Sequence, residues 1–117
     1  MLFMLIVKAS KNSESGNRPN EILNRAMRQY NEALENAGVR VMAKGLYPSS
    51  NGLRIAYPVE GGEPIITEGP FKDEMNLVAG FILIDVACKE DAVKWALAMP
   101  DPQGFGEGQI ELRQVFE

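Results

Sequence analysis

The residues of this chain that could do chemistry are acids, tyrosines, lysines, serines and one thiol, because the sequence contains no histidine. Histidine is the commonest general base near neutral pH and the commonest metal ligand. A proton transfer would therefore fall first to a carboxylate. Asp73 is the leading candidate, because it follows a Glu-Gly-Pro-Phe turn that would place it near the edge of a sheet.

A small ligand would need other polar groups close to that acid. Tyr30 lies on a predicted helix, and Lys44, Ser49 and Ser50 lie on a predicted strand and the turn after it. A phenol, an ammonium and two hydroxyls can bind a small carboxylate or a polarised carbonyl. We therefore expect these groups to meet Asp73 in one pocket. The structural alternative is a tyrosine at the core edge, a surface lysine and a serine-rich turn.

The remaining reactive or charged groups have simpler interpretations. Cys88 is the only cysteine, and it stands just before a predicted helix without a histidine to activate it. Arg25, Arg28 and Arg40 are interpreted as surface charges on a helix and an edge strand. The sequence has no metal-ligand spacing, glycine-rich phosphate loop or dinucleotide fingerprint, so it predicts no metal and no cofactor.

Composition narrows the class of protein. The chain has 117 residues and a net charge of -4, which favours one domain over 1–117 and argues against nucleic-acid binding. A single cysteine cannot form an intrachain disulfide, which fits a reducing cytoplasm. The apolar run at the N-terminus is too short to span a membrane, so no membrane contact is expected.

The elements that would position these residues follow from hydrophobic periodicity. The strands at 1–9 and 77–86 are apolar on both faces, as central strands are, whereas 39–47 and 109–116 alternate like edge strands. A polar loop is expected at 10–20. The other expected elements are helices at 21–37 and 89–99, a hairpin at 53–57 and 63–67, and a short helical turn at 71–76.

Without the hairpin, the order strand, helix, strand, strand, helix, strand is that of a ferredoxin-like α+β fold. Its right-handed crossovers put the first and third core strands at the centre of an antiparallel sheet. Two helices can cover only one face, so a large apolar face remains. We expect a second copy of the chain to cover it in a homodimer. The alternative is that the inserted hairpin folds over that face.

The turn Glu68-Gly69-Pro70-Phe71 carries a resemblance to a known family. Its glycine is free to adopt positive φ, its proline redirects the chain, and Phe71 is expected to enter the core. The chain resembles the YCII-related family, in the branch named for its DGPF motif. The other segments that carry the resemblance are Lys8 after the apolar strand, Tyr30-Asn31-Glu32, Gly45-Leu46-Tyr47-Pro48-Ser49-Ser50, Gly80-Phe81 and Ile110-Glu111-Leu112-Arg113-Gln114-Val115.

The resemblance implies a ferredoxin-like fold and a dimeric α+β barrel, but no single activity. Some members accompany extracytoplasmic-function sigma factors, and relatives in the superfamily are small-molecule isomerases, dehalogenases and monooxygenases. This chain departs from the motif at Glu68, where the family has Asp. It also lacks the histidine of the His–Asp pair that some members resemble, so that mechanism is not carried over.

The leading functional expectation is a cytoplasmic homodimer that binds a small molecule in a cleft beside the sheet. One alternative is a cofactor-free isomerase or lyase that moves a proton on a small carbonyl compound, with Asp73 as the base. Another is a protein-interaction module associated with sigma-factor regulation. A deep polar cleft would favour an enzyme, and a flat apolar patch would favour the interaction module.

Overall fold

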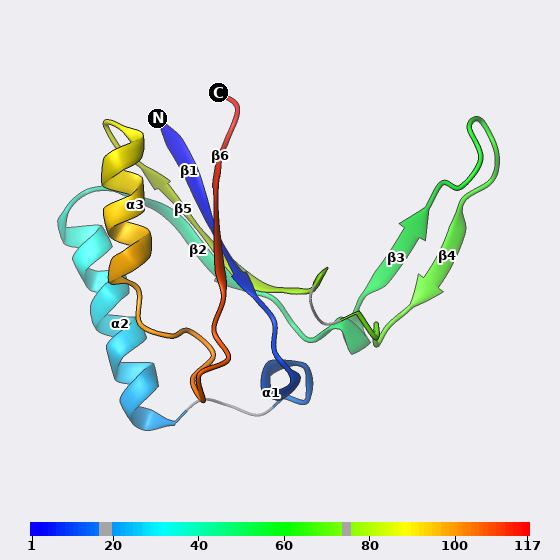
Figure 1. The fold of residues 1–117 in the computed structure, drawn as a ribbon, viewed down its shortest axis with the longest axis horizontal. Helices are drawn as coiled ribbons and strands as arrows, with labels where there is room; N and C mark the ends of the chain where they lie inside the picture. Colours follow the sequence, from blue (N-terminus) through cyan, green and yellow to red (C-terminus); the bar gives the residue numbers. More distant parts are fainter. Residues whose placement is uncertain (17–19, 74–75) are drawn as a thin grey trace.

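The computed structural model describes residues 1–16, 20–73 and 76–117. It is a mixed α/β structure in which helices pack beside an antiparallel sheet, with a small separate sheet (Figure 1). Within these ranges no helix is both long enough and apolar enough to cross a membrane. The elements are β1 (Leu2–Lys8), α1 (Lys11–Glu14), α2 (Glu21–Asn36), β2 (Arg40–Gly45), the 3-10 turn η1 (Ser49–Asn51), β3 (Leu53–Ala56), β4 (Ile65–Glu68), β5 (Val78–Asp85), α3 (Lys89–Ala98) and β6 (Ile110–Gln114).

The main sheet has four antiparallel strands in the order β2-β5-β1-β6. The two strands that are apolar on both faces, β1 and β5, are therefore the central pair, as the sequence predicts. The alternating strands β2 and β6 form the edges. Local signals place α2, since the Asn20 side chain accepts a hydrogen bond from the Leu23 amide at 2.9 Å and Gly38 follows the helix with φ +73°.

The core lies between the sheet and the helices α2 and α3. Alternate residues of the central strands are buried there, because successive side chains of a strand point to opposite faces. Its fully buried large side chains are Phe3, Leu5, Leu34 and Ile84. The intervening residues of β1 and β5 lie on the opposite face, which we call the open face. Its apolar members are partly exposed: Leu2, Met4, Ile6, Phe81 and Leu83.

A bulge in β2 changes which face its first residue occupies. Ala43 pairs with Ile82 and Met42 pairs with Leu83, but Arg40 pairs with Ile84, so Val41 is an extra residue. Because the side-chain period of a strand is two, one inserted residue moves Arg40 from the open face to the face covered by helices. The simple alternation expected over 39–47 is therefore wrong at this point.

Two further segments differ from the sequence-based expectations. The loop expected at 10–20 contains the short helix α1, which Ser10 and Ser13 begin by exchanging side-chain to backbone hydrogen bonds at 3.2 and 2.8 Å. The hairpin formed by β3 and β4 does not cover the open face but projects away from the sheet (Figure 1). The helical turn expected at 71–76 includes residues 74–75, which lie outside the described ranges.

Candidate functional site

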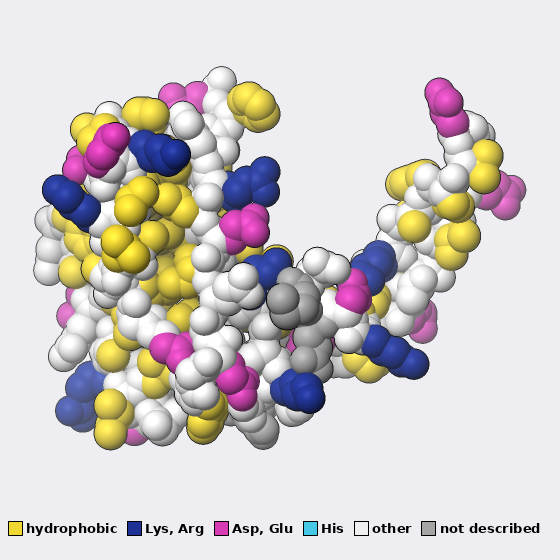
Figure 2. Space-filling model, in the orientation of Figure 1, with side chains coloured by type: hydrophobic (Ala, Val, Ile, Leu, Met, Phe, Trp, Pro, Cys, Tyr) yellow, Lys and Arg dark blue, Asp and Glu magenta, His cyan; other side chains and the backbone are white. Residues whose placement is uncertain are grey.

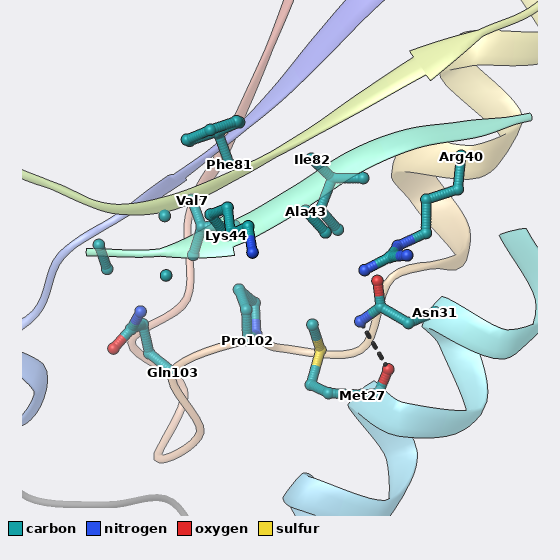
Figure 3. Close-up of a pocket in the computed structure, with 13 residues that line it drawn as sticks. Val7, Met27, Asn31, Arg40, Ala43, Lys44, Phe81, Ile82, Pro102 and Gln103 are labelled. Atoms are coloured by element: carbon teal, nitrogen blue, oxygen red, sulfur yellow. Dashed lines mark hydrogen bonds between the residues drawn. The ribbon is translucent and has the colours of Figure 1, made fainter. Parts of the chain in front are cut away.

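A cavity of about 340 Å³ lies between α2, the edge strand β2 and the loop that follows α3 (Figure 3). We call it the α2–β2 cavity. Its wall combines apolar side chains with four polar ones. The residues that matter for its chemistry are Met27, Asn31, Arg40, Ala43, Lys44 and Gln103.

Arg40 enters this cavity because of the bulge in β2. Its Nη1 atom donates a hydrogen bond to Glu35 Oε1 at 2.6 Å, which fixes one side of the guanidinium at the end of α2. Its Nε atom is buried and has no hydrogen-bond partner within residues 1–16, 20–73 and 76–117. The guanidinium is therefore oriented and only partly satisfied.

Asn31 presents the complementary group on α2. Its Nδ2 atom donates to the Met27 carbonyl one turn earlier at 3.1 Å, whereas its Oδ1 atom is buried without a partner. Figure 3 shows the Asn31 and Arg40 side chains pointing toward one another at one end of the cavity. A buried donor and a buried acceptor without partners each carry a cost of roughly 1–3 kcal/mol.

Lys44 borders the cavity from the edge strand β2, but it pairs in register with Phe81, so its side chain starts on the side of the open face. It lies on the exposed edge strand and makes no ion pair with any residue that the structure describes. The flexible four-carbon stem of a lysine lets its ammonium adapt to an anion. Gly80, on β5, also lines the cavity, and a β-carbon there would lie 2.8 Å from the Lys44 carbonyl oxygen, so glycine permits the close approach of β5 and β2.

A second cavity, of about 390 Å³, lies beside the motif turn. We call it the motif cavity. Here the polar groups satisfy one another, because the Ser49 amide donates to Glu14 Oε2 at 2.9 Å and the Ser49 hydroxyl donates to Glu14 Oε1. The same hydroxyl accepts from the Phe71 amide at 3.0 Å. This relay ties α1, η1 and the motif turn together.

Gly69 makes the turn possible through close contact rather than through its φ angle. It is not among the glycines with positive φ, although glycine is free to adopt such angles. A β-carbon on Gly69 would lie 1.7 Å from the Ser49 carbonyl oxygen, a distance that no packing allows. Its amide donates to the Gly52 carbonyl at 3.1 Å, and a cis peptide bond joins it to Pro70.

The residues after this turn are more exposed than expected. Phe71 does not join the core; its ring is partly exposed and lies 4.1 Å beneath the guanidinium of Arg54. Asp73 is exposed and accepts from Arg54 Nη1 at 3.0 Å and from Asn76 Nδ2 at 3.3 Å. The hydrogen bond from Arg54, followed by that from Asn76, lowers the pKa of Asp73 below its usual value. A lowered pKa makes this carboxylate a weaker proton acceptor near neutral pH.

Tyr30 has a structural position between the two helices. Its hydroxyl donates to the Trp95 carbonyl at 2.6 Å, and the two rings meet edge to face with centroids 6.2 Å apart. Burial raises the pKa of Tyr30 to about 12, so the phenol stays protonated. Ser50 is exposed, with only a 3.4 Å contact to Asn51 Oδ1. The five residues expected in one pocket therefore lie apart, with Lys44 in the α2–β2 cavity and Ser49 in the motif cavity.

Sequence reasoning missed the two central residues of the α2–β2 cavity. Arg40 was interpreted as a surface charge, and the bulge that turns it inward has no clear signature in the sequence. Asn31 did have a signal, because it falls between Met27 and Leu34 on the inward stripe of α2. A polar residue on an otherwise apolar helical stripe is an informative departure from the pattern.

Comparison with protein families gives one match. The family model of the YCII-related domain matches residues 1–117. The chain therefore belongs to the YCII-related family over its whole length. No curated protein matches the sequence at a significant level.

Proposed function

We propose that this YCII-related domain is a homodimeric small-molecule-binding protein whose α2–β2 cavity takes a small carboxylate. The observation that carries this proposal is the pair of buried atoms Arg40 Nε and Asn31 Oδ1, which border one cavity and have no hydrogen-bond partner among the residues that the structure describes. A bound anion that accepts from Arg40 and donates to Asn31 would remove the cost of both unpaired groups.

The two atoms also narrow the chemistry of the ligand. Arg40 Nε needs an acceptor, which a carboxylate supplies with charge assistance. Asn31 Oδ1 needs a donor, which a carboxylate lacks but an adjacent hydroxyl or amino group supplies. The ligand class is therefore a small hydroxy- or amino-carboxylate. A cavity of about 340 Å³ is at the lower end of the range for ligand pockets, which suits a molecule of this size.

The assembly part of the proposal rests on the open face. The apolar side chains of β1 and β5 on this face are partly exposed, whereas α2 and α3 cover the other face of the sheet. A second copy packed on this face would form a dimeric α+β barrel, and the strand order is compatible with a ferredoxin-like topology. We assign the chain to the DGPF-motif branch on its Glu68–Phe71 turn and place it in the cytoplasm.

Ligand binding is favoured over proton transfer by Asp73. The carboxylate is exposed, engaged by Arg54 and absent from the residues that line the α2–β2 cavity. An isomerase or lyase would need a base with a pKa closer to the working pH and within reach of the bound substrate. The lowered pKa of Asp73 works against that role.

The test is a calorimetric titration of the protein with glycolate, lactate and glycine, using acetate as the probe without a second polar group. We expect Arg40→Gln to weaken binding by roughly 10–100-fold, the equivalent of one charge-assisted hydrogen bond. The exposed ion pair with Glu35 is worth little to stability, so the variant should still fold.

The matched control is Arg28→Gln, which removes an exposed arginine of α2 and should leave affinity unchanged. Asn31→Leu should abolish the preference of the wild-type protein for glycolate over acetate. Equal affinity of the Arg40 and Arg28 variants for every probe would exclude the cavity as the binding site. So would the absence of any saturable binding to the wild-type protein.

A further inference from the structure

The hairpin of β3 and β4 stands apart from the rest of the molecule. We call residues 53–68 the arm. Figure 1 shows it leaving the body next to η1 and running away on the side opposite to α2 and α3. The radius of gyration is 16.0 Å. A compact domain of this length would have a radius of gyration of about 13 Å. A single chain is therefore more extended than a self-contained domain.

Each face of the arm carries an apolar pair of residues beside a pair that contains a polar one. In register, Ile55 lies opposite Ile66 and Ala56 lies opposite Ile65. An isolated two-stranded hairpin is marginally stable in water and normally needs a packing partner. Six large apolar side chains of the arm are about half exposed or more: Leu53 53%, Ile55 49%, Tyr57 73%, Val59 64%, Ile65 56% and Ile66 61%.

The arm and the open face border the same hollow. Figure 2 shows this hollow between the body and the arm. On the body side, the edge strand β6 contributes Glu111 and Arg113, which pair in register with Ile6 and Met4 of the open face. The hollow thus has the apolar side chains of the arm on one side and, on the other, the open face with the charged residues Glu111 and Arg113 at its β6 edge. Neither surface has a covering layer within the described part of the chain.

We propose that the arm embraces a second copy of this chain, packing β3 and β4 against the partner while the two open faces meet. This inference rests on the homodimer of the proposed function and adds the arm to its interface. A two-fold axis makes the contact isologous, so each arm packs against the other subunit and the result is a closed dimer. The same arm docked head to tail would leave one arm unoccupied at each end.

The size of the open face supports an additional contact. The face spans four strands, with five register pairs between β1 and β6. At about 4.8 Å between strands and about 3.3 Å per residue, over five to seven paired residues, its projected area is roughly 300–450 Å². A stable interface typically buries about 800 Å² on each partner. The open face alone falls short, and the apolar arm that continues from its edge supplies further area.

The first experiment measures dimerisation by sedimentation equilibrium. The arm variant combines Ile55→Glu and Ile66→Glu, which place two charges on one face of the arm without touching the core. We expect its dimer dissociation constant to rise by about 100-fold or more, as for the loss of interface hot spots. The matched control is Leu97→Glu, an 81% exposed position on α3, which should change the constant by no more than about threefold.

The second experiment measures amide hydrogen exchange of β3 and β4 in the wild-type protein at different concentrations. Protection that is strong in the dimer and lost on dilution supports the intersubunit arm. Protection that does not depend on concentration would mean that the arm folds onto its own subunit, which overturns the inference.

These outcomes distinguish the contact made by the arm from the homodimer on which it rests. A wild-type protein that is monomeric would overturn both the homodimer and the arm contact. A wild-type dimer that the arm variant leaves intact would overturn only the arm contact. Carboxylate binding in the α2–β2 cavity is tested independently by the Arg40 titration, because that cavity lies on the helix-covered face.

Discussion

The two cavities beside the main sheet differ in how their polar groups are satisfied. In the motif cavity, Ser49 binds both oxygens of Glu14 and also the amide of Phe71. In the α2–β2 cavity, Arg40 Nε and Asn31 Oδ1 are buried without partners. The first arrangement is complete as it stands, whereas the second leaves a donor and an acceptor that the proposed ligand would satisfy.

This difference distinguishes the conspicuous motif from the proposed binding site. The Glu68–Phe71 turn carries the family resemblance, but its contacts hold three segments of backbone together. Asn31 and Arg40 are unremarkable in the sequence, and they leave hydrogen-bonding capacity unused. Buried polar groups normally have hydrogen-bond partners. Two buried groups without partners in one cavity are therefore the more informative signal of function. The predicted effects of substitution in the two regions therefore have opposite signs.

The largest expected effect is that of Gly69→Ala on stability. The new β-carbon would lie 1.7 Å from the Ser49 carbonyl oxygen, so the turn or η1 must move. We expect a loss of about 2–3 kcal/mol, as for severe overpacking. Thermal unfolding should show a midpoint lower by roughly 10 °C. Gly45→Ala is the control, because its β-carbon would meet nothing closer than 3.9 Å. Equal midpoints for the two variants would refute the close contact.

A smaller loss of stability is expected for Ser49→Ala. The substitution should leave ligand affinity unchanged. The substitution removes the hydroxyl that links Glu14 to the Phe71 amide. Leaving these partly buried groups unpaired should cost about 1–2 kcal/mol in chemical unfolding. Ser50→Ala, at an exposed neighbour, should stay within about 0.5 kcal/mol of wild type. If Ser49→Ala weakened carboxylate binding more than it weakened the fold, the motif cavity would be the site.

The smallest effect on stability, and the one that separates the regions most sharply, is expected for Asn31→Leu. Leucine removes an unpaired buried oxygen and has the better helix propensity. The free energy of unfolding should stay level or rise by roughly 0.5 kcal/mol. Carboxylate affinity should fall in the same variant. A clear loss of stability would show that Asn31 serves the fold, as Ser49 does.

Local patterns in the chain were enough to predict most of the main sheet and its helices. The apolar runs around Leu5 and Ile84 identified the central strands, and the helix predicted over 21–37 occupies Glu21–Asn36. These features depend on neighbours in the chain, namely side-chain period, a capping side chain and a terminating glycine. The short helix α1 was not predicted, because its signal, a capping box of serines, is weaker than that of an apolar stripe.

Hydrophobic periodicity is a property of neighbouring residues, so the order of residues along the chain was sufficient to predict the main strands and helices and the central position of β1 and β5. The places where polar side chains meet depend instead on tertiary packing. One extra residue in β2 turns Arg40 toward Asn31, and the approach of Gly69 to Ser49 sets the motif turn. Both depend on the register between segments distant in the sequence. A shift of one residue there reverses the face of a side chain and leaves the local pattern almost unchanged.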